Sequence, residues 1–221
     1  WSFHVELVRD SVRGRKKGSY VVLPFFTVSY QHTHTSTVIL DLGCAKAKYL
    51  RHLASLNVNM NYLGIEIREE VAEYANLKAK EEGLGNFHVI GGFAAESVLP
   101  DLTGCAQDAD VKLRALNVFH PDPWVKKKHI KRRIVNSSFV RLLETYLPRD
   151  TAILLQTDVS DLHEYHREVF QENSKRYLFT DDEEHVVPCF ETYMGDVLTD
   201  RHRAVLNNDG DIYRAVLLER E

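Results

Sequence analysis

From residue 36 onward, short apolar runs alternate with segments whose apolar residues recur at helical spacing. The runs of strand length occupy residues 36–43, 61–67, 86–92, 112–119, 151–159 and 211–220. The helical segments occupy residues 48–57, 69–83, 94–102, 137–147 and 160–173, with Ser137 or Ser138 as the expected N-cap of the fourth. Strand and helix in turn, with short connections, are typical of a doubly wound, mostly parallel sheet. We therefore predict an α/β, Rossmann-like fold with helices on both faces of the sheet.

The length of the chain fits one such domain. A chain of 221 residues can bury a sizeable core without disulfides or metals. We expect residues 36–221 to form the domain and residues 1–35 to form an irregular arm with a basic cluster at residues 13–17. That cluster is read as a solvated loop, with a transit-peptide remnant or a contact to an anionic partner as alternatives. No stretch reaches the roughly 18 consecutive apolar residues of a membrane span, so we expect no membrane partner.

Cysteine and histidine give no sign of a metal site. The three cysteines form no CxxC pair, which argues against zinc, and their odd number argues against a disulfide scaffold. A reducing compartment fits this usage better. His163 and His166 lie on one predicted helix without a partner cluster, so we expect them at the surface and expect no metal.

The ends of the predicted strands are where a doubly wound sheet binds its ligands. The first strand ends "DLGCAKAK". Many enzymes hold the amino-acid half of S-adenosyl-L-methionine with an Asp-x-Gly-x-Gly-x-Gly loop at this place, and of that pattern Asp41 and Gly43 remain, which taken alone is a weak signal. Ala45 and Ala47 stand where glycines would let the backbone approach a ligand. The second strand ends at Glu66, which could accept both hydroxyls of an adenosine ribose, or could be an exposed residue ahead of the next helix.

The stretch "FHPDPWVKKKHIKRRIV" (119–135) carries the strongest local signal. Two prolines hold Asp122 rigidly at a strand end, where its carboxylate could accept hydrogen bonds from a base such as guanine. Trp124 offers a ring for stacking, and six basic residues within 126–133 could neutralise phosphates. Because the net charge is −4, nucleic acid would have to bind through a local patch of this kind. A bare charge run is often a solvated face, but the preceding Pro-Asp-Pro-Trp favours an RNA site.

These residues resemble the tRNA (guanine-N7-)-methyltransferases, whose motif is similar to Phe-Pro-Asp-Pro-Trp-x-Lys-x-x-His-x-Lys-Arg-Arg. The segments "YLGIEIREEV", "QTDV" and "TDRH" (199–202) resemble further elements of the family in the same order, and the resemblance covers about residues 36–221. It implies a class I methyltransferase that transfers a methyl group from S-adenosyl-L-methionine to N7 of a guanine in the variable loop of tRNA.

The resemblance also implies roles for individual residues. The catalytic residue would be Asp122. Cofactor-binding residues would be Asp41, Gly43, Glu66, Ile67, Arg68, Phe93, Ala94 and Phe119. Substrate-binding residues would be Lys126, Asp158, Thr199, Asp200, Arg201 and His202. The tRNA phosphate track would be Lys127, Lys128, Lys131, Arg132 and Arg133.

The sequence departs from the family pattern in the cofactor loop and near the guanine site, at Ala45, Ala47, Phe93, His120 and His202. Two alternatives therefore stay open: a tRNA-binding member with weakened or lost catalysis, and a methyltransferase for another substrate. The resemblance also implies tRNA as partner and a monomer or homodimer, with a WD-repeat partner subunit if the source is a eukaryotic nucleus. Trp124 after Pro-Asp-Pro favours a bacterial or organellar protein, hence a cytoplasmic or organellar location.

Overall fold

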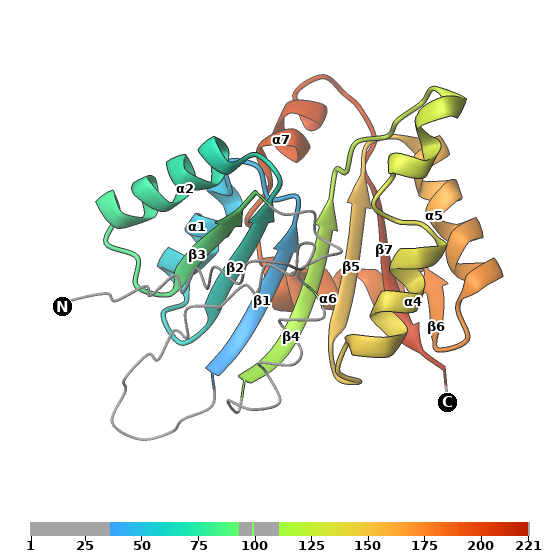
Figure 1. The fold of residues 1–221 in the computed structure, drawn as a ribbon, viewed down its shortest axis with the longest axis horizontal. Helices are drawn as coiled ribbons and strands as arrows, with labels where there is room; N and C mark the ends of the chain where they lie inside the picture. Colours follow the sequence, from blue (N-terminus) through green and yellow to red (C-terminus); the bar gives the residue numbers. More distant parts are fainter. Residues whose placement is uncertain (1–35, 93–98, 100–110, 221) are drawn as a thin grey trace, which may run out of the picture.

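A seven-stranded sheet forms the centre of the computed structural model, which describes residues 36–92, 99 and 111–220 (Figure 1). The strands are β1 (Ser36–Leu42), β2 (Asn61–Glu66), β3 (Phe87–Gly91), β4 (Val111–Phe119), β5 (Ala152–Thr157), β6 (Tyr177–Thr180) and β7 (Tyr213–Glu219). Their order is β3-β2-β1-β4-β5-β7-β6, and only β7 runs antiparallel to its neighbours. The predicted α/β fold with a mostly parallel sheet is confirmed.

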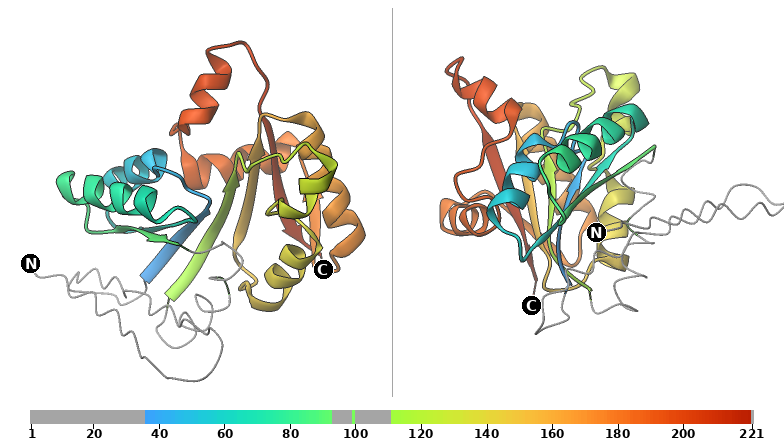
Figure 2. Two further views of the ribbon diagram at one scale, coloured as in Figure 1. Left: turned by 45° about the horizontal axis from the view of Figure 1, so that its top comes forward. Right: turned by 90° about the vertical axis from the view of Figure 1, so that its left-hand side faces the viewer.

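Helices cover both faces of this sheet, as its edge-on view shows (Figure 2). The described helices are α1 (Lys48–Leu56), α2 (Glu69–Glu81), α4 (Ser137–Tyr146), α5 (Ser160–Asn173), α6 (Glu183–Met194), α7 (Asp200–Leu206) and the 3₁₀ helix η1 (Lys127–Arg132). Helices α4 and α5 pack in one apolar cluster, and α1, α2 and α6 pack in another. Successive strand residues point to opposite faces, so Leu40 joins the first cluster and Ile39 the second.

Several sequence expectations need correction. The N-cap of α4 is Asn136, not Ser137 or Ser138, because its side-chain oxygen accepts hydrogen bonds from the backbone N–H groups of Ser138 (2.9 Å) and Phe139 (3.0 Å). Strand β6 and helices α6 and α7 were not expected. The arm at 1–35 lies outside the described residues, and so does the helix expected at 94–102 apart from its buried Leu99.

The two histidines expected at the surface of α5 are buried instead. His166 is only 1% exposed, and His163 packs between the rings of Phe179 and Tyr213. Both belong to the face of α5 that packs on the sheet. Among the described residues, no group of three or more His, Cys, Asp or Glu side chains could hold a metal ion. No helix in the described part of the chain is long and apolar enough to cross a bilayer.

Candidate active site

A pocket of about 620 Å³ opens at the carboxyl ends of the strands, where the strand order reverses between β1 and β4. Five segments that lie far apart in the sequence line it: residues 41 and 43–49 at the end of β1 and beyond it, residues 68 and 71 at the start of α2, residues 119–123 at the end of β4 and beyond it, residues 158–159 after β5, and residues 199–201 at the start of α7. A crevice at this switch point is the usual ligand site of an open α/β sheet. The fold therefore gathers most of the residues that the sequence singled out.

The loop after β1 keeps a glycine-like backbone although it contains two alanines. Gly43, Ala45 and Ala47 all have positive φ, at 80°, 49° and 48°. The N–H groups of Gly43 and Cys44 both donate to the carbonyl of Ile65, at 2.8 and 3.0 Å, which ties the loop to β2. An L-residue in the left-handed region costs about 1–2 kcal/mol, so the neighbouring contacts hold the alanines in a conformation that glycine adopts freely.

Asp41 is a buried carboxyl group at the floor of the pocket. It is 2% exposed, and its register partner on β4 is the buried Asn117. Burial raises the pKa of Asp41 to about 7; the Tyr49 hydroxyl acts against this shift and the Glu66 carboxylate adds to it. An acid that lacks a cationic partner in this position would gain one from a ligand that carries an ammonium group.

Glu66 is buried at the end of β2, so the reading of this residue as an exposed one is wrong. Its Oε2 accepts the backbone N–H of Ala45 at 3.0 Å, and its Oε1 accepts the backbone N–H and Nε of Arg68 at 3.0 and 2.7 Å. Burial alone would raise the pKa of Glu66, but these bonds outweigh it and hold the pKa below its ordinary value. The next side chain, Ile67, is 66% exposed.

The loop after β4 brings Asp122 to the pocket. The Phe119 ring lies at its base, with centroids 5.8 Å from those of both Tyr49 and Phe190. Asp122 is exposed and lines the pocket between its two prolines. Trp124 has a φ of 40°, and its ring lies 5.5 Å from the ring of His129. The loop thus presents a carboxylate to the pocket and an aromatic ring beside the basic helix.

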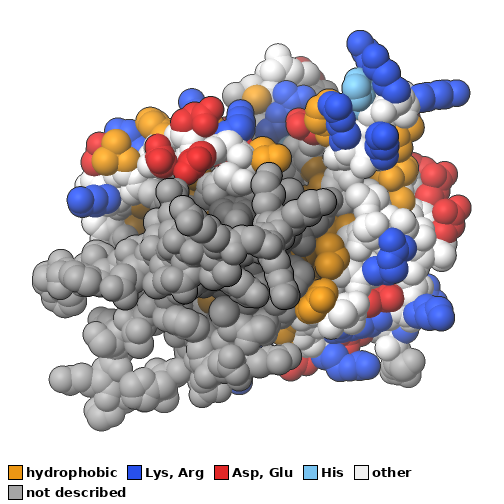
Figure 3. Space-filling view, viewed as in Figure 1, with side chains coloured by type: hydrophobic (Ala, Val, Ile, Leu, Met, Phe, Trp, Pro, Cys, Tyr) orange, Lys and Arg blue, Asp and Glu red, His pale blue; other side chains and the backbone are white. Residues whose placement is uncertain are grey.

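Helix η1 displays an exposed basic run on one side of the pocket. Lysine and arginine side chains gather there (Figure 3, upper right). The exposed members of the run are Lys126, Lys127, Lys128, Lys131 and Arg132. Arg133 departs from the expected phosphate track because it is buried: its Nε donates to the carbonyl of Pro123 at 2.8 Å, and its guanidinium lies 4.3 Å from the centroid of the Tyr165 ring. It supports the loop rather than the basic surface.

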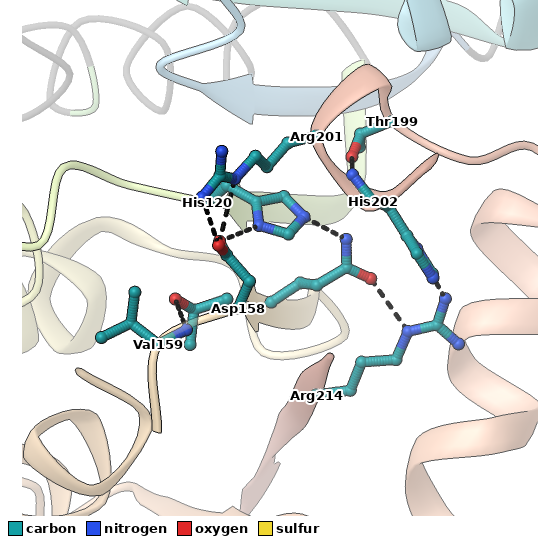
Figure 4. A network of polar contacts seen from close by, with 9 residues as sticks. His120, Asp158, Val159, Thr199, Arg201, His202 and Arg214 are labelled. Atoms are coloured by element: carbon teal, nitrogen blue, oxygen red, sulfur yellow. Dashed lines mark hydrogen bonds and ion pairs between the residues drawn. The ribbon is translucent and has the colours of Figure 1, made fainter. Parts of the chain in front are cut away.

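Asp158 and the start of α7 close the pocket on the β5 side (Figure 4). Asp158 lies against His120 and Arg201, with its Oδ1 3.0 Å from His120 Nδ1 and its Oδ2 accepting Arg201 Nε at 3.0 Å. Thr199 caps α7 by accepting the backbone N–H of His202 at 3.0 Å. Asp200 forms an ion pair of 2.9 Å with Lys48, which joins the start of α7 to the start of α1.

The structure separates the remaining predicted residues. His202, expected to bind substrate, is buried and does not line the pocket; its Nδ1 faces Arg214 Nη2 of β7 at 3.4 Å. Phe93 and Ala94 lie outside the described residues. Sequence reasoning assigned no role to Gln156 and Arg214, which contact the site from β5 and β7. Gln156 opens the segment "QTDV", but Arg214 belongs to no motif, and the meeting of the two depends on the antiparallel pairing of the strands.

The fold and the strand-end pocket define a class I methyltransferase architecture. Solved structures of low identity share it: an antibiotic related methyltransferase (TM-score 0.56, 16% identity, 85% of this chain and 89% of that chain) and the 16S rRNA methyltransferase KamB (TM-score 0.53, 16% identity, 84% and 88%). A SAM dependent methyltransferase from Aquifex aeolicus is also similar (TM-score 0.51, 12% identity, 84% of each chain).

Sequence relatives identify the family within this class. Residues 35–215 match the family described as "Putative methyltransferase". The tRNA (guanine-N(7)-)-methyltransferase of Prochlorococcus marinus (strain AS9601) is 34% identical over 181 residues, which are 81% of this chain and 84% of the relative. That of Microcystis aeruginosa is 31% identical over 182 residues, 82% of each. The chain belongs to the tRNA (guanine-N7-)-methyltransferase family.

Proposed function

We propose that this protein transfers a methyl group from S-adenosyl-L-methionine to N7 of a guanine in the variable loop of tRNA. The observation that carries the proposal is the pocket itself, in which Asp122 and Asp158 line the same space as the loop after β1. The motif resemblance and the family membership both support it.

The residues of the pocket fit the cofactor. The backbone of the Gly43–Ala47 loop leaves room for a ligand, since no atom lies within 4 Å of where a Gly43 Cβ would be. Asp41 lines the pocket and would supply a carboxyl group for the amino-acid half. Glu66 is buried behind Arg68, which does line the pocket. Release of the bond from Arg68 Nε to Glu66 Oε1 would free that carboxylate for the ribose. Ile67, Phe93, Ala94 and Phe119 complete the proposed cofactor site. When bound, S-adenosyl-L-methionine supplies a methyl group that its sulfonium has already activated.

The chain's own residues would then act mainly by alignment. Guanine N7 carries an exposed lone pair, so no base is needed to prepare it for reaction. Lys126, Asp158, Thr199, Asp200 and Arg201 would position the guanine and its surroundings, which lowers the barrier by proximity. The purine gains positive charge as N7 gains its methyl group, and the fixed carboxylate of Asp122 would stabilise that charge.

The basic surface beside the pocket would position the RNA. Lys127, Lys128, Lys131 and Arg132 are exposed on η1 and can neutralise backbone phosphates without reading the sequence. The guanine must also be accessible, so recognition would depend on the shape of tRNA and on local unstacking. In this proposal the basic residues of η1 contribute to tRNA affinity, and the residues of the pocket carry out methyl transfer.

Two finer features belong to the same proposal. We infer action as a monomer or homodimer in the cytoplasm or an organelle, and a WD-repeat partner only if the source is a eukaryotic nucleus. The relatives from Prochlorococcus and Microcystis, and Trp124 after Pro-Asp-Pro, favour the bacterial or organellar setting. Light scattering after gel filtration would give the oligomeric state directly.

The test is transfer of a labelled methyl group from S-adenosyl-L-methionine to unmodified tRNA, with the labelled nucleoside identified. We expect 7-methylguanosine. Label in another nucleoside would assign a different reaction. If the folded protein binds tRNA but transfers no label, the alternative of a catalytically inactive tRNA-binding protein would be favoured. That alternative was suggested by Ala45 and Ala47, and the glycine-like backbone conformation of both residues weakens it.

A further inference from the structure

His120 occupies a strained position directly after β4. Its φ is 48°, in the left-handed region that non-glycine residues rarely adopt. Its backbone N–H donates to the carbonyl of Gln156 at 2.7 Å, which extends the β4–β5 pairing by one residue. Its side chain is only 8% exposed and lies at the wall of the pocket. Such a conformation persists only where the surroundings fix it, and strained residues of this kind cluster at functional sites.

A chain of hydrogen bonds fixes which nitrogen of His120 carries the proton. Arg214 can only donate, so Gln156 Oε1 accepts its Nε at 2.9 Å. The amide nitrogen of Gln156 therefore points the other way and donates to His120 Nε2 at 2.9 Å. With Nε2 as acceptor, the ring proton is on Nδ1, which donates to Asp158 Oδ1 at 3.0 Å. Each group in this series of hydrogen bonds is therefore fixed as donor or acceptor by the group before it.

The chain ends on the carboxylate that faces the pocket. His120 holds one oxygen of Asp158 and Arg201 holds the other, so the carboxylate cannot rotate (Figure 4). Arg214 also faces Nδ1 of His202 at 3.4 Å, which makes that nitrogen an acceptor too. One arginine on β7 thereby sets the tautomers of two histidines.

We propose that His120 is a positioning residue for methyl transfer: its neutral Nδ1–H form, imposed by Arg214 through Gln156, orients Asp158 toward the target guanine. The inference rests on the proposed function. It assigns a purpose to His120, which departs from the family motif, and to Gln156 and Arg214, to which the sequence assigned no role.

The surroundings of His120 favour the neutral ring. The groups that face it are Asp158 and Gln156 from the β5 side, Arg201 and His202 from α7, and Arg214 from β7. Burial lowers the pKa of His120 and the two arginines lower it further, while Asp158 opposes them. Protonation would place a second N–H against the amide nitrogen of Gln156, which Arg214 prevents from turning.

The test compares three variants with the wild type in 7-methylguanosine formation. Asn can donate from near the position of Nδ1 and does not titrate, so His120→Asn should retain most of the activity. His120→Phe removes the donor, and kcat/KM for tRNA should fall about tenfold to a hundredfold through misplacement of Asp158. Gln156→Glu presents only acceptors to His120, so it should favour the protonated ring and move the acid limb of the pH–rate profile to higher pH. The Kd for S-adenosyl-L-methionine should stay within about twofold in all three, since a positioning role at Asp158 does not involve the cofactor.

Nitrogen NMR of the imidazole ring supplies a readout that is independent of activity. We expect the Nδ1–H tautomer of His120 in the wild type and its loss in Arg214→Met. Equal activity loss in His120→Asn and His120→Phe, full activity in His120→Phe, or an Nε2–H tautomer would each overturn the positioning role. A wild type that forms no 7-methylguanosine would instead contradict the proposed function, whatever tautomer NMR shows.

Discussion

Ala45 and Ala47 show that a residue can depart from a sequence motif and still keep the backbone conformation that the motif requires. Because alanine replaces glycine at both positions, the sequence suggested weakened cofactor binding. Both residues nevertheless have positive φ, as glycine would at these positions. Hydrogen bonds to the carbonyl of Ile65 hold the loop, and the Cys44 side chain packs directly against Gly64 of β2. The packing is so close that a Cβ added at Gly64 would lie only 2.5 Å from Cys44 Sγ. The motif's function therefore depends on backbone geometry, which alanine can supply at some cost in stability.

We expect Ala45→Gly and Ala47→Gly to leave the stability unchanged or to raise it. Removing left-handed strain gains about 1–2 kcal/mol each, and the added freedom of the unfolded chain offsets roughly 0.4–1 kcal/mol of that. Ala47 also loses a buried methyl group, worth about 0.8 kcal/mol, so the clearer gain is expected at the exposed Ala45. Ala204→Gly, on the exposed side of α7, is the matched control and should destabilise by about 1 kcal/mol. Urea unfolding measures all three. Equal losses at the loop and helix positions would show that the loop alanines are unstrained.

Burial of the Asp41 carboxyl lowers the stability of the ligand-free protein at neutral pH. Below pH 3.8 its carboxyl is protonated in both states, and as pH rises to about 7 the unfolded chain ionises while the folded protein stays protonated. The buried acid therefore costs stability that grows over this window, on the order of 2–4 kcal/mol at its upper end.

Asp41→Asn should accordingly stabilise the ligand-free protein at pH 8 and leave it nearly unchanged at pH 4. Asparagine has the same shape and no ionisation cost, but it offers no charge to the cofactor. Calorimetry at pH 8 should show weaker binding of S-adenosyl-L-methionine. A variant that loses stability at pH 8, or that binds the cofactor as tightly as the wild type, would contradict the account of Asp41.

At the scale of elements, the exposed run on η1 should determine how tRNA binding responds to salt. Each phosphate contact contributes about −0.7 to −0.9 to the slope of log K against log salt. The triple variant Lys127→Gln, Lys128→Gln, Lys131→Gln should therefore flatten the slope by about 2–3 and weaken binding. The control is Lys112→Gln with Lys175→Gln, because these exposed lysines lie at the amino ends of β4 and β6, whereas η1 follows the carboxyl end of β4. A slope that changes equally in both variants would remove η1 from the interface.

Elements differ in how far the sequence predicts them. The parallel strands appear as apolar runs because both faces are covered, and all six residues of β2 are buried. The segment from β6 to α7 gave no such signal: β6 has four residues, and α6 contains Pro188, which normally interrupts a helix. Charge alone could not separate Arg133 from its exposed neighbours, because its burial depends on Tyr165 of α5. The site residues that lie in motifs were predictable from the sequence. The contact between Gln156 on β5 and Arg214 on β7 was not, because it depends on how the two strands pair.

At the scale of the whole molecule, buried neutral histidines make the fold sensitive to acid. Burial lowers the pKa of His166 to about 3 and that of His202 to about 4, with His120 lowered as well. Above pH 6.5 both the folded and unfolded states are neutral at these sites, so their contribution to stability is complete. As pH falls, the unfolded chain binds protons first and the folded state loses stability.

His166→Leu isolates one of these contributions. His166 Nε2 is buried without a hydrogen-bond partner, so leucine should cost little at pH 8. At pH 5 the variant should be more stable than the wild type by about 2 kcal/mol, since each pH unit below 6.5 costs a buried neutral histidine about 1.4 kcal/mol. The exposed His52→Leu is the control and should show no such dependence. The same stability difference at both pH values would rule out this role for His166.

We propose that the pocket between the loops after β1 and β4 places Asp122 where guanine N7 is methylated. The most direct measurement is the single-turnover rate of 7-methylguanosine formation by the wild type and by Asp122→Asn, at saturating tRNA and S-adenosyl-L-methionine. Asparagine keeps the shape of the side chain and removes its charge. We expect the rate to fall about a hundredfold or more in Asp122→Asn, with cofactor affinity and fold unchanged. Equal rates in the two proteins would contradict it.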